Sequence, residues 1–202
     1  MGHYHAEYTG YTAVIAVPRD MLIAGYGGRE INTLRLWDAK SPNSLDMYLF
    51  SEGEYVKSME QRTMAEVITK VLYPPDEHVE GKVLRLKQQY FFVSATAQDV
   101  VRKHICKWGD IKSFAEHHAM QINDTHPTLI IPELMRIFMD EYGLGWDEAW
   151  DIVTHSVAYT NHTVMSEALE KWPQDIVQQL LPRLWEILCE INRRWCDYLV
   201  QN

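Results

Sequence analysis

The sequence lacks the features that mark several large classes of protein. Cysteine is scarce, and Cys106, Cys189 and Cys196 form neither an even disulfide set nor a paired C-x-x-C metal motif. We therefore expect a reducing, cytoplasmic setting, with Cys189 and Cys196 on one helical face as small core residues. No apolar run reaches the roughly 18 residues that a membrane span needs, and the first residues lack the apolar segment of a signal peptide. These absences favour a soluble intracellular protein with no membrane partner.

Positive charge is also in short supply. The chain has 19 lysines and arginines against 28 acidic residues, a net charge of −9, which argues against nucleic-acid binding by phosphate neutralisation. The pairs Arg102-Lys103 and Arg193-Arg194 fall in helical patterns and predict surface charge. The glycines at 25–28 do not have the spacing of a phosphate-binding loop and predict a plain turn. The sequence therefore does not show a complete site for a phosphate substrate.

What is present is a chain suited to one sizeable core. Of its 202 residues, 47% are hydrophobic, which excludes a disordered protein. β-Branched residues at 12–17, before Pro18, and at 31–37 predict strands, so residues 1–50 form a strand-rich start. Longer segments with helical spacing follow. The predicted fold class is α/β, predominantly helical, with a few short strands and long helices.

A long helix is predicted after this start. Ser51 and Glu54 have the spacing of a capping box, in which each side chain bonds the backbone of the other residue. Apolar residues then recur near helical spacing, which predicts one helix over residues 54–72. Pro74 and Pro75 must end it, because proline cannot continue a helix without losing a hydrogen bond.

An acidic loop over residues 73–81 separates this helix from a second one, which is predicted to begin after Gly81. Residues 82–202 are predicted to be mainly helical. The stretch after Pro182 carries apolar residues close to heptad spacing, and we expect an amphipathic helix that packs on the core.

Two polar loops follow two short predicted strands. Residues 119–122 and 157–160 have the pattern of short strands, and the polar segments 123–126 and 159–163 come at their carboxyl ends. In α/β sheets, ligands are usually bound at the carboxyl ends of the strands. Buried polar side chains need partners, so these loops either satisfy one another or face a polar ligand.

The side chains of the polar segments leave several chemistries open. Asp124, His126 and His162 could assemble as metal ligands of a hydrolase, although D-x-H is a common pattern. Tyr73 could stack on a sugar or act as a hydrophobic staple for its loop. The carboxylates at 76–80 could bind sugar hydroxyls or remain solvated.

Several motifs carry a resemblance to a known family. They are QINDTHPTLIIPELMR (121–136), AYTNHTVMSEALEKWP (158–173) and YPPDEHVEGKVLRLKQQYF (73–91), with VIAVPRDMLIAGY (14–26), NTLRLWDAKSP (32–42) and LLPRLWEILCEIN (180–192). All six occur in the same order as in the family. Together they resemble the glycogen, starch and maltodextrin phosphorylases over essentially the whole chain.

The resemblance implies that residues 1–202 form one partial domain, the later part of the N-terminal domain of a longer two-domain enzyme. Family members use inorganic phosphate to cleave the terminal α-1,4 link of a glucan, releasing α-glucose 1-phosphate with retained configuration. Their pyridoxal phosphate is attached to a lysine of the C-terminal domain. We therefore expect no cofactor-binding residue, no metal site and no phosphorolysis in this chain alone. A noncatalytic carbohydrate-binding or assembly module is the alternative.

The resemblance also assigns residues to a sugar site. His162 resembles the family histidine whose main-chain carbonyl faces the oxocarbenium-like sugar and whose side chain binds the sugar's O6. Asn161 and Thr163 would shape the same loop. Asp124 and His126 resemble residues that line the pocket beside the glucose.

The acidic loop and the helix before it resemble two further family features. Tyr73 resembles the tyrosine that stacks on the acceptor sugar, and residues 73–81 resemble the mobile gate, with Asp76 and Glu77 facing the substrate. Glu77 stands where many relatives carry asparagine, and an ionised carboxylate cannot donate a hydrogen bond there. Residues 54–72 resemble the tower helix that joins two subunits, so we expect a homodimer.

Overall fold

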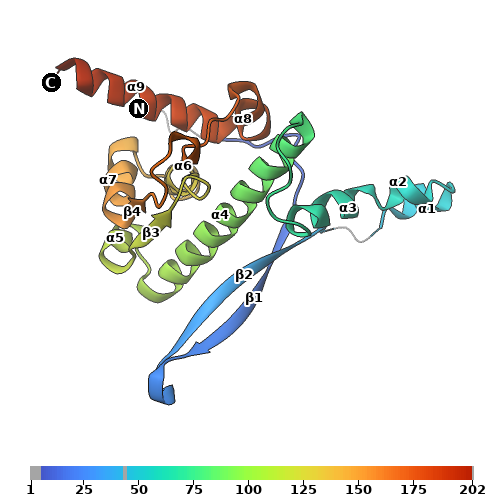
Figure 1. Ribbon diagram of the computed structural model, residues 1–202, viewed down its shortest axis with the longest axis horizontal. Helices are drawn as coiled ribbons and strands as arrows, with labels where there is room; N and C mark the ends of the chain where they lie inside the picture. Colours follow the sequence, from blue (N-terminus) through green and yellow to red (C-terminus); the bar gives the residue numbers. More distant parts are fainter. Residues whose placement is uncertain (1–5, 43–44, 202) are drawn as a thin grey trace. The chain divides into compact units, whose positions relative to one another are not determined.

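The computed structural model describes residues 6–42 and 45–201 (Figure 1). Helices dominate, and the strands form two small two-stranded sheets, which confirms the predicted α/β, predominantly helical class. The described chain divides into two compact units. The smaller unit is Tyr8–Phe91, and the larger one holds residues 92–201 together with residues 6 and 7.

The smaller unit begins with a long antiparallel hairpin. Strand β1 (Ile15–Ala24) pairs with β2 (Ile31–Lys40), and a 3-10 turn, η1 (Tyr26–Gly28), joins them. The prediction that the first strand ends before Pro18 was wrong, because β1 continues through it opposite Trp37. Each strand of a two-stranded sheet is an edge strand, where a proline without an N–H is tolerated.

The helical part of this unit starts with α1 (Met47–Ser51). The side chain of Asp46 caps α1 by accepting hydrogen bonds from the backbone N–H groups of its first turn. The predicted capping box was therefore wrong: Ser51 is the last residue of α1, and its hydroxyl donates to the carbonyl of Tyr48 at 2.8 Å. Glu54 precedes the next helix without a side-chain capping bond.

The single helix predicted over residues 54–72 is divided. It consists of α2 (Tyr55–Ser58), α3 (Glu60–Glu66) and the 3-10 segment η2 (Val67–Thr69). The break has a non-local cause, because the Ser58 carbonyl accepts the backbone N–H of Asp46 at 3.0 Å. A carbonyl engaged by a distant residue is not available for the regular bond four residues further along the helix.

Two polar side chains hold this helical segment in place within the smaller unit. Thr69 accepts the backbone N–H of Ala39 at 3.1 Å and donates to Asp38 at 3.3 Å. Gln88, which is buried, donates to the carbonyls of Ile68 at 2.9 Å and Val71 at 2.7 Å. These bonds satisfy carbonyls at the end of η2, before the chain reaches the two prolines.

Helix α4 (Val79–Trp108) is the longest helix of the described chain, and its residues belong to both units. It begins two residues before Gly81, slightly earlier than predicted. In the larger unit it is followed by η3 (Ile111–Ser113), α5 (Phe114–His117) and strand β3 (Met120–Asn123).

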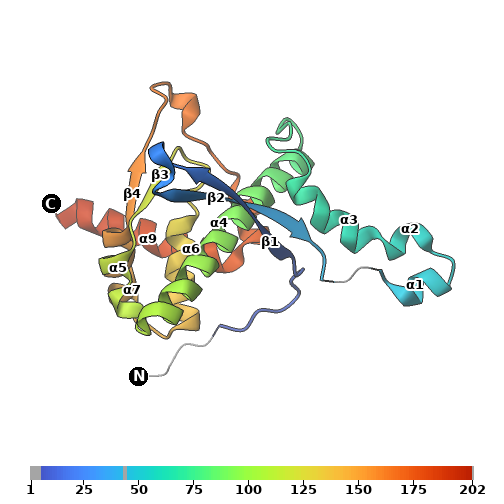
Figure 2. The same ribbon diagram turned by 90° about the horizontal axis from the view of Figure 1, so that it is seen from below.

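The remainder of the larger unit is helical except for one strand. The elements in order are α6 (Ile130–Arg136), a π-helical turn η4 (Ile137–Glu141), α7 (Trp146–Ser156), β4 (Val157–Thr160), η5 (Ser166–Ala168), α8 (Gln174–Leu180) and α9 (Pro182–Gln201). Strands β3 and β4 lie side by side and run parallel, from Met120 opposite Val157 to Asn123 opposite Thr160 (Figure 2). Both predicted short strands are thus confirmed.

The core of the larger unit lies among α4, α5, α6, α7 and α9. Its largest fully buried apolar side chains include Phe114, Phe138, Leu134 and Ile187. The predicted amphipathic helix after Pro182 is confirmed in α9, whose first half buries Leu184 and Ile187. None of the described helices is long and apolar enough to cross a membrane.

The cysteines do not belong to this core. Cys189 and Cys196 do share one face of α9, but both are exposed, as is Cys106. Their predicted placement as core residues was wrong because Ile187 is the buried position, and a residue two places further along a helix points to nearly the opposite side.

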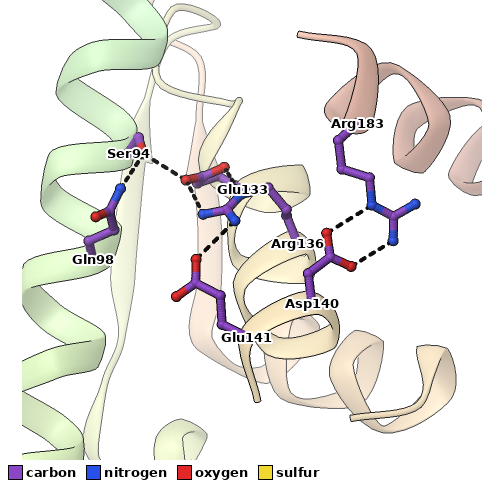
Figure 3. A network of polar contacts seen from close by, with 7 residues as sticks. All are labelled: Ser94, Gln98, Glu133, Arg136, Asp140, Glu141 and Arg183. Atoms are coloured by element: carbon purple, nitrogen blue, oxygen red, sulfur yellow. Dashed lines mark hydrogen bonds and ion pairs between the residues drawn. The ribbon is translucent and has the colours of Figure 1, made fainter. Parts of the chain in front are cut away.

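A buried polar network ties α6 to the helices around it (Figure 3). Glu133, which is fully buried, accepts hydrogen bonds from Arg136 at 2.8 and 3.0 Å and from Ser94 of α4 at 2.7 Å. Arg183 of α9 donates to both oxygens of Asp140 at 2.9 and 2.8 Å. The bond from Ser94 joins α4 to α6, and the pair of Arg183 with Asp140 joins α9 to η4. Loss of one partner of such a buried charge pair would be costly.

Candidate functional site

The candidate site is built where β3 and β4 end. Because the strands are parallel and in register, their last residues, Asn123 and Thr160, lie next to each other and bring the two polar loops together. The backbone N–H of Asp124 donates to the carbonyl of Thr160 at 2.9 Å. The side-chain amide of Gln121 donates to the hydroxyl of Thr160 at 2.6 Å. The two polar loops thus meet at the carboxyl ends of the strands and form hydrogen bonds with each other, which is one of the two alternatives left open by the sequence.

His162 receives its main contacts from the other loop. Its backbone N–H donates to a carboxylate oxygen of Asp124 at 3.2 Å, and its Nε2 lies 2.8 Å from the side-chain oxygen of Asn123. Asp124 has a φ of +62°, in the left-handed region that aspartate tolerates better than most residues. The residue with this backbone conformation, Asp124, is also the one whose carboxylate joins the two loops.

The loop around His162 also has internal hydrogen bonds. The side-chain amide of Asn161 donates to the carbonyl of Thr163 at 3.0 Å and accepts the backbone N–H of Thr163 at 3.3 Å. Such bonds between an asparagine side chain and the nearby backbone stabilise a tight turn. Polar groups of the two loops thus satisfy one another, while Asn161, His162 and Thr163 remain exposed.

The remaining predicted residue of the first loop is His126, which is partly buried in the turn before α6. Its neighbour Thr125 donates to the carbonyl of Ala168 and to Glu170, both at 3.2 Å. The alternative of a metal-dependent hydrolase finds no support here. Within residues 6–42 and 45–201, no three histidine, cysteine or acidic side chains are placed to hold a metal ion.

The second group of predicted residues lies in the smaller unit, between η2 and α4. Tyr73 has a φ of +54°, unusual for an aromatic residue, and the residue is 64% exposed. The guanidinium of Arg85 lies 5.9 Å from the centre of this ring and forms an ion pair with Asp76 at 2.8 Å. Glu77 is exposed. Arg85 therefore links the two residues that the sequence placed in one loop.

Gly81 allows this loop to lie against the first turn of α4. A Cβ atom at Gly81 would come within 1.8 Å of the carbonyl oxygen of Pro75, so a larger residue would push the loop away. In the sequence, Gly81 indicated only a helix start, and this contact was not predicted. Arg85 was also not predicted to belong to this group. The only indication in the sequence is that Arg85 lies one turn after Gly81 in the same helix.

A separate group of histidines lies at the end of α4. His104 is fully buried, and its Nε2 donates to the carbonyl of Asp110 at 2.8 Å, because a carbonyl can only accept. Its Nδ1 lies 3.1 Å from Nε2 of His118. Burial lowers the pKa of His118, with further contributions from His104, His117 and Lys107. None of these residues was singled out by the sequence analysis.

The described residues do not fit pyridoxal phosphate. A lysine that forms a Schiff base needs an enclosed, partly desolvated position, and no lysine among residues 6–42 and 45–201 is buried. The arginines of the buried network, Arg136 and Arg183, bond to carboxylates of their own chain. Arginines already neutralised in this way do not form a cationic cage for a phosphate group.

Comparisons with known proteins give a consistent result. A family model described as carbohydrate phosphorylase matches residues 1–202. The chain is 47% identical over 195 residues to the liver form of human glycogen phosphorylase, covering 93% of this chain and 23% of that protein. It is 45% identical over 208 residues to the human muscle form, covering 96% and 25%. For the mouse muscle form the identity is 46% over 200 residues, covering 95% and 24%. The chain thus spans about a quarter of the length of these relatives.

Proposed function

Because the chain belongs to the carbohydrate phosphorylase family, we propose that the complete polypeptide is an α-glucan phosphorylase. It cleaves a terminal α-1,4-glucosidic link with inorganic phosphate and releases α-glucose 1-phosphate with retained configuration. The observation that carries this proposal is the joining of two polar loops around His162, at the ends of parallel strands. Exposed polar groups with fixed orientation are suited to binding a sugar, whose hydroxyls require directed hydrogen bonds.

The catalytic role falls to His162. Its main-chain carbonyl is a dipole that can stabilise positive charge developing on the sugar ring, and its imidazole binds a sugar hydroxyl. Asp124 supports this role by accepting the backbone N–H of His162. Asn161 and Thr163 keep the loop in its turn, and His126 contributes to the wall of the same pocket.

The loop before α4 binds the acceptor side of the glucan. The exposed ring of Tyr73 offers a flat apolar face for stacking on a sugar. Asp76 and Glu77 accept hydrogen bonds from sugar hydroxyls, and the ion pair of Asp76 with Arg85 sets the resting position of the loop. We propose that residues 73–81 act as a gate over the substrate.

The chain contributes only part of the enzyme. Since no described lysine is buried and the arginines of the buried network bond to carboxylates of their own chain, we place the cofactor on a part of the protein outside this chain. The isolated chain is then expected to hold no cofactor and to show no phosphorolysis. We further propose a cytoplasmic homodimer that meets through the segment from α2 to η2.

The test is the phosphorolysis of maltodextrin by the full-length protein. His162→Ala is expected to lower turnover by roughly 10- to 1000-fold, the range for loss of one transition-state contact. His155→Ala is the matched control, because His155 is an exposed histidine on α7 that bonds within its own helix. Equal turnover of His162→Ala and wild type would remove His162 from the site.

A second candidate function is a noncatalytic carbohydrate-binding module, which is favoured by the lack of an enclosed lysine in the described chain. The same assay separates the two candidates. A full-length protein that binds maltodextrin but forms no glucose 1-phosphate would support the module. Sustained turnover by the isolated chain, abolished by His162→Ala, would instead show that the catalytic centre has been misplaced.

A further inference from the structure

The hydrogen bond between Asn123 and His162 determines where the imidazole carries its proton. The side-chain oxygen of Asn123 lies 2.8 Å from Nε2 of His162, and an amide oxygen can only accept a hydrogen bond. Nε2 must therefore be the protonated nitrogen. A neutral imidazole carries only one N–H, so Nδ1 of His162 is left as an acceptor.

We propose that Asn123 is a positioning residue that fixes the tautomer of His162, so that His162 Nδ1 accepts a hydrogen bond from a hydroxyl of the terminal sugar. This inference rests on the proposed function and adds to it the direction of a hydrogen bond. A hydroxyl can donate to Nδ1, whereas a sugar without a hydroxyl at that position leaves the acceptor unpaired. Asn123 thus acts on specificity through His162 without touching the substrate.

The surroundings of the ring support this assignment. Asn123 is the last residue of β3 and lies opposite Thr160 of β4, so the pairing of the two strands fixes the backbone position of Asn123. Asp124 is the acidic residue that bonds to His162 among the described residues, and it accepts the backbone N–H of His162. The carboxylate is thereby engaged by the main chain, which leaves the orientation of the ring to Asn123.

The structure also offers a matched control for a merely structural role. Gln121 lies two residues before Asn123 and joins the same two strands through its bond to Thr160 at 2.6 Å. Within the described part of the chain, the imidazole of His162 bonds to Asn123 and not to Gln121. Gln121→Leu therefore removes a cross-link between β3 and β4 but leaves the partner of His162 Nε2 in place. Asn123→Leu removes the partner itself.

The first measurement is the ¹⁵N spectrum of the histidine side chains in the 202-residue chain at alkaline pH. We expect His162 in the Nε2–H form in the wild type and in Gln121→Leu. Asn123→Leu should give a mixture of tautomers, and Asn123→Asp, which keeps an acceptor, should restore the Nε2–H form. A wild-type His162 protonated on Nδ1, or an unchanged tautomer in Asn123→Leu, would overturn the proposal.

The second measurement uses the full-length protein, so it does not depend on how the chain behaves alone. Asn123→Leu is expected to lower kcat/KM for glucose-ended maltodextrin by about 10-fold or more. Without Asn123 the imidazole can carry its proton on Nδ1, and Nδ1 then no longer accepts a hydrogen bond from the sugar hydroxyl. With a maltodextrin whose terminal glucose lacks the 6-hydroxyl, the same variant should change kcat/KM by less than about twofold. Gln121→Leu should affect both substrates equally.

An equal loss on both substrates in Asn123→Leu would show a structural role only and would contradict the proposal. This outcome differs from the one expected if the proposed phosphorolysis itself is wrong. If the full-length protein carries out no phosphorolysis, the kinetic comparison cannot show a difference between substrates, but the ¹⁵N spectrum still decides which nitrogen of His162 is protonated.

Discussion

Tyr73 combines an exposed ring with a backbone conformation that few aromatic residues adopt. A left-handed φ at a bulky residue costs free energy, and such residues cluster at binding sites. The contact with Arg85 is long, at 5.9 Å from the ring centre, and the residue is largely exposed to solvent. These features support stacking of Tyr73 on a sugar more than a purely structural role, in which the ring would only hold its own loop as a hydrophobic staple.

In the full-length protein, Tyr73→Ala should weaken the use of oligosaccharides by about 5- to 100-fold in kcat/KM, which corresponds to the loss of one stacking contact. Tyr73→Phe keeps the ring and should stay close to wild type. Initial rates with short and long maltodextrins at fixed phosphate give the measurement. Unchanged rates for Tyr73→Ala with both substrates would support the staple instead.

His118 makes the stability of the larger unit depend on pH. Its folded-state pKa lies below the ordinary value of 6.5, chiefly because of burial. The unfolded state therefore binds the proton more readily, and the free energy of unfolding falls as the pH drops from about 6.5 toward the folded-state pKa. His118→Gln keeps a donor for His104 but cannot titrate, so its melting temperature should fall less between about pH 8 and pH 5. His155→Gln should retain the wild-type pH dependence, and an identical profile for His118→Gln would exclude this role.

At the scale of elements, Arg136 neutralises the buried Glu133 within helix α6, and Glu133 in turn joins α6 to α4 through Ser94 (Figure 3). Glu133→Ala leaves Arg136 without its main partner, and we expect a loss of about 3–5 kcal/mol in the free energy of unfolding. Replacing both residues, by Glu133→Leu with Arg136→Met, should recover much of this loss, since no unpaired buried charge remains and Glu141, which loses its contact with Arg136, is exposed to solvent. Urea unfolding provides the measurement.

Arg62→Ala is the control for this comparison, because Arg62 forms an exposed ion pair with Glu66 and should change stability very little. If the double variant were as unstable as Glu133→Ala, the loss would come from packing and not from an unpaired buried arginine.

Elements with a clear local signal were predictable from the sequence. Strands β3 and β4 and helix α9 were found because a short apolar run and a repeating apolar stripe are visible without knowledge of the fold. The helix over residues 54–72 was drawn as continuous because its interruption is non-local: the Ser58 carbonyl bonds to Asp46. Periodicity cannot report a hydrogen bond to a distant residue.

The candidate site was predictable to a similar degree. The two polar loops follow from strand ends, and their meeting requires only that the strands pair in parallel, as they do. The roles of individual residues came from family resemblance. Arg85 and Gly81 were not foreseen, since one depends on the position of Asp76 in space and the other on a close approach of the Pro75 carbonyl.

For the molecule as a whole, the segment from α2 to η2 offers a test of assembly. Met59 and Met64 are 45% and 52% exposed, which is more apolar exposure than a solvent-facing helix requires. In the full-length protein, Met59→Glu combined with Met64→Glu should shift the dimer toward monomer by about 10-fold or more in dissociation constant. Sedimentation velocity over a concentration series measures this shift. A dimer as tight as wild type would place the subunit contact elsewhere.

The parallel pairing of β3 with β4 has a consequence for the order in which the chain acquires its structure. Asn123 and His162 are 39 positions apart in sequence, and α6 and α7 lie between them. Closing such a long loop has an entropic cost that is recovered only when the intervening helices have docked. During synthesis, Asn123 leaves the ribosome well before its partner, so helix formation precedes the two strands' pairing. The two polar loops therefore come together only after α6 and α7 have docked, while α8 and α9 still follow them in the chain.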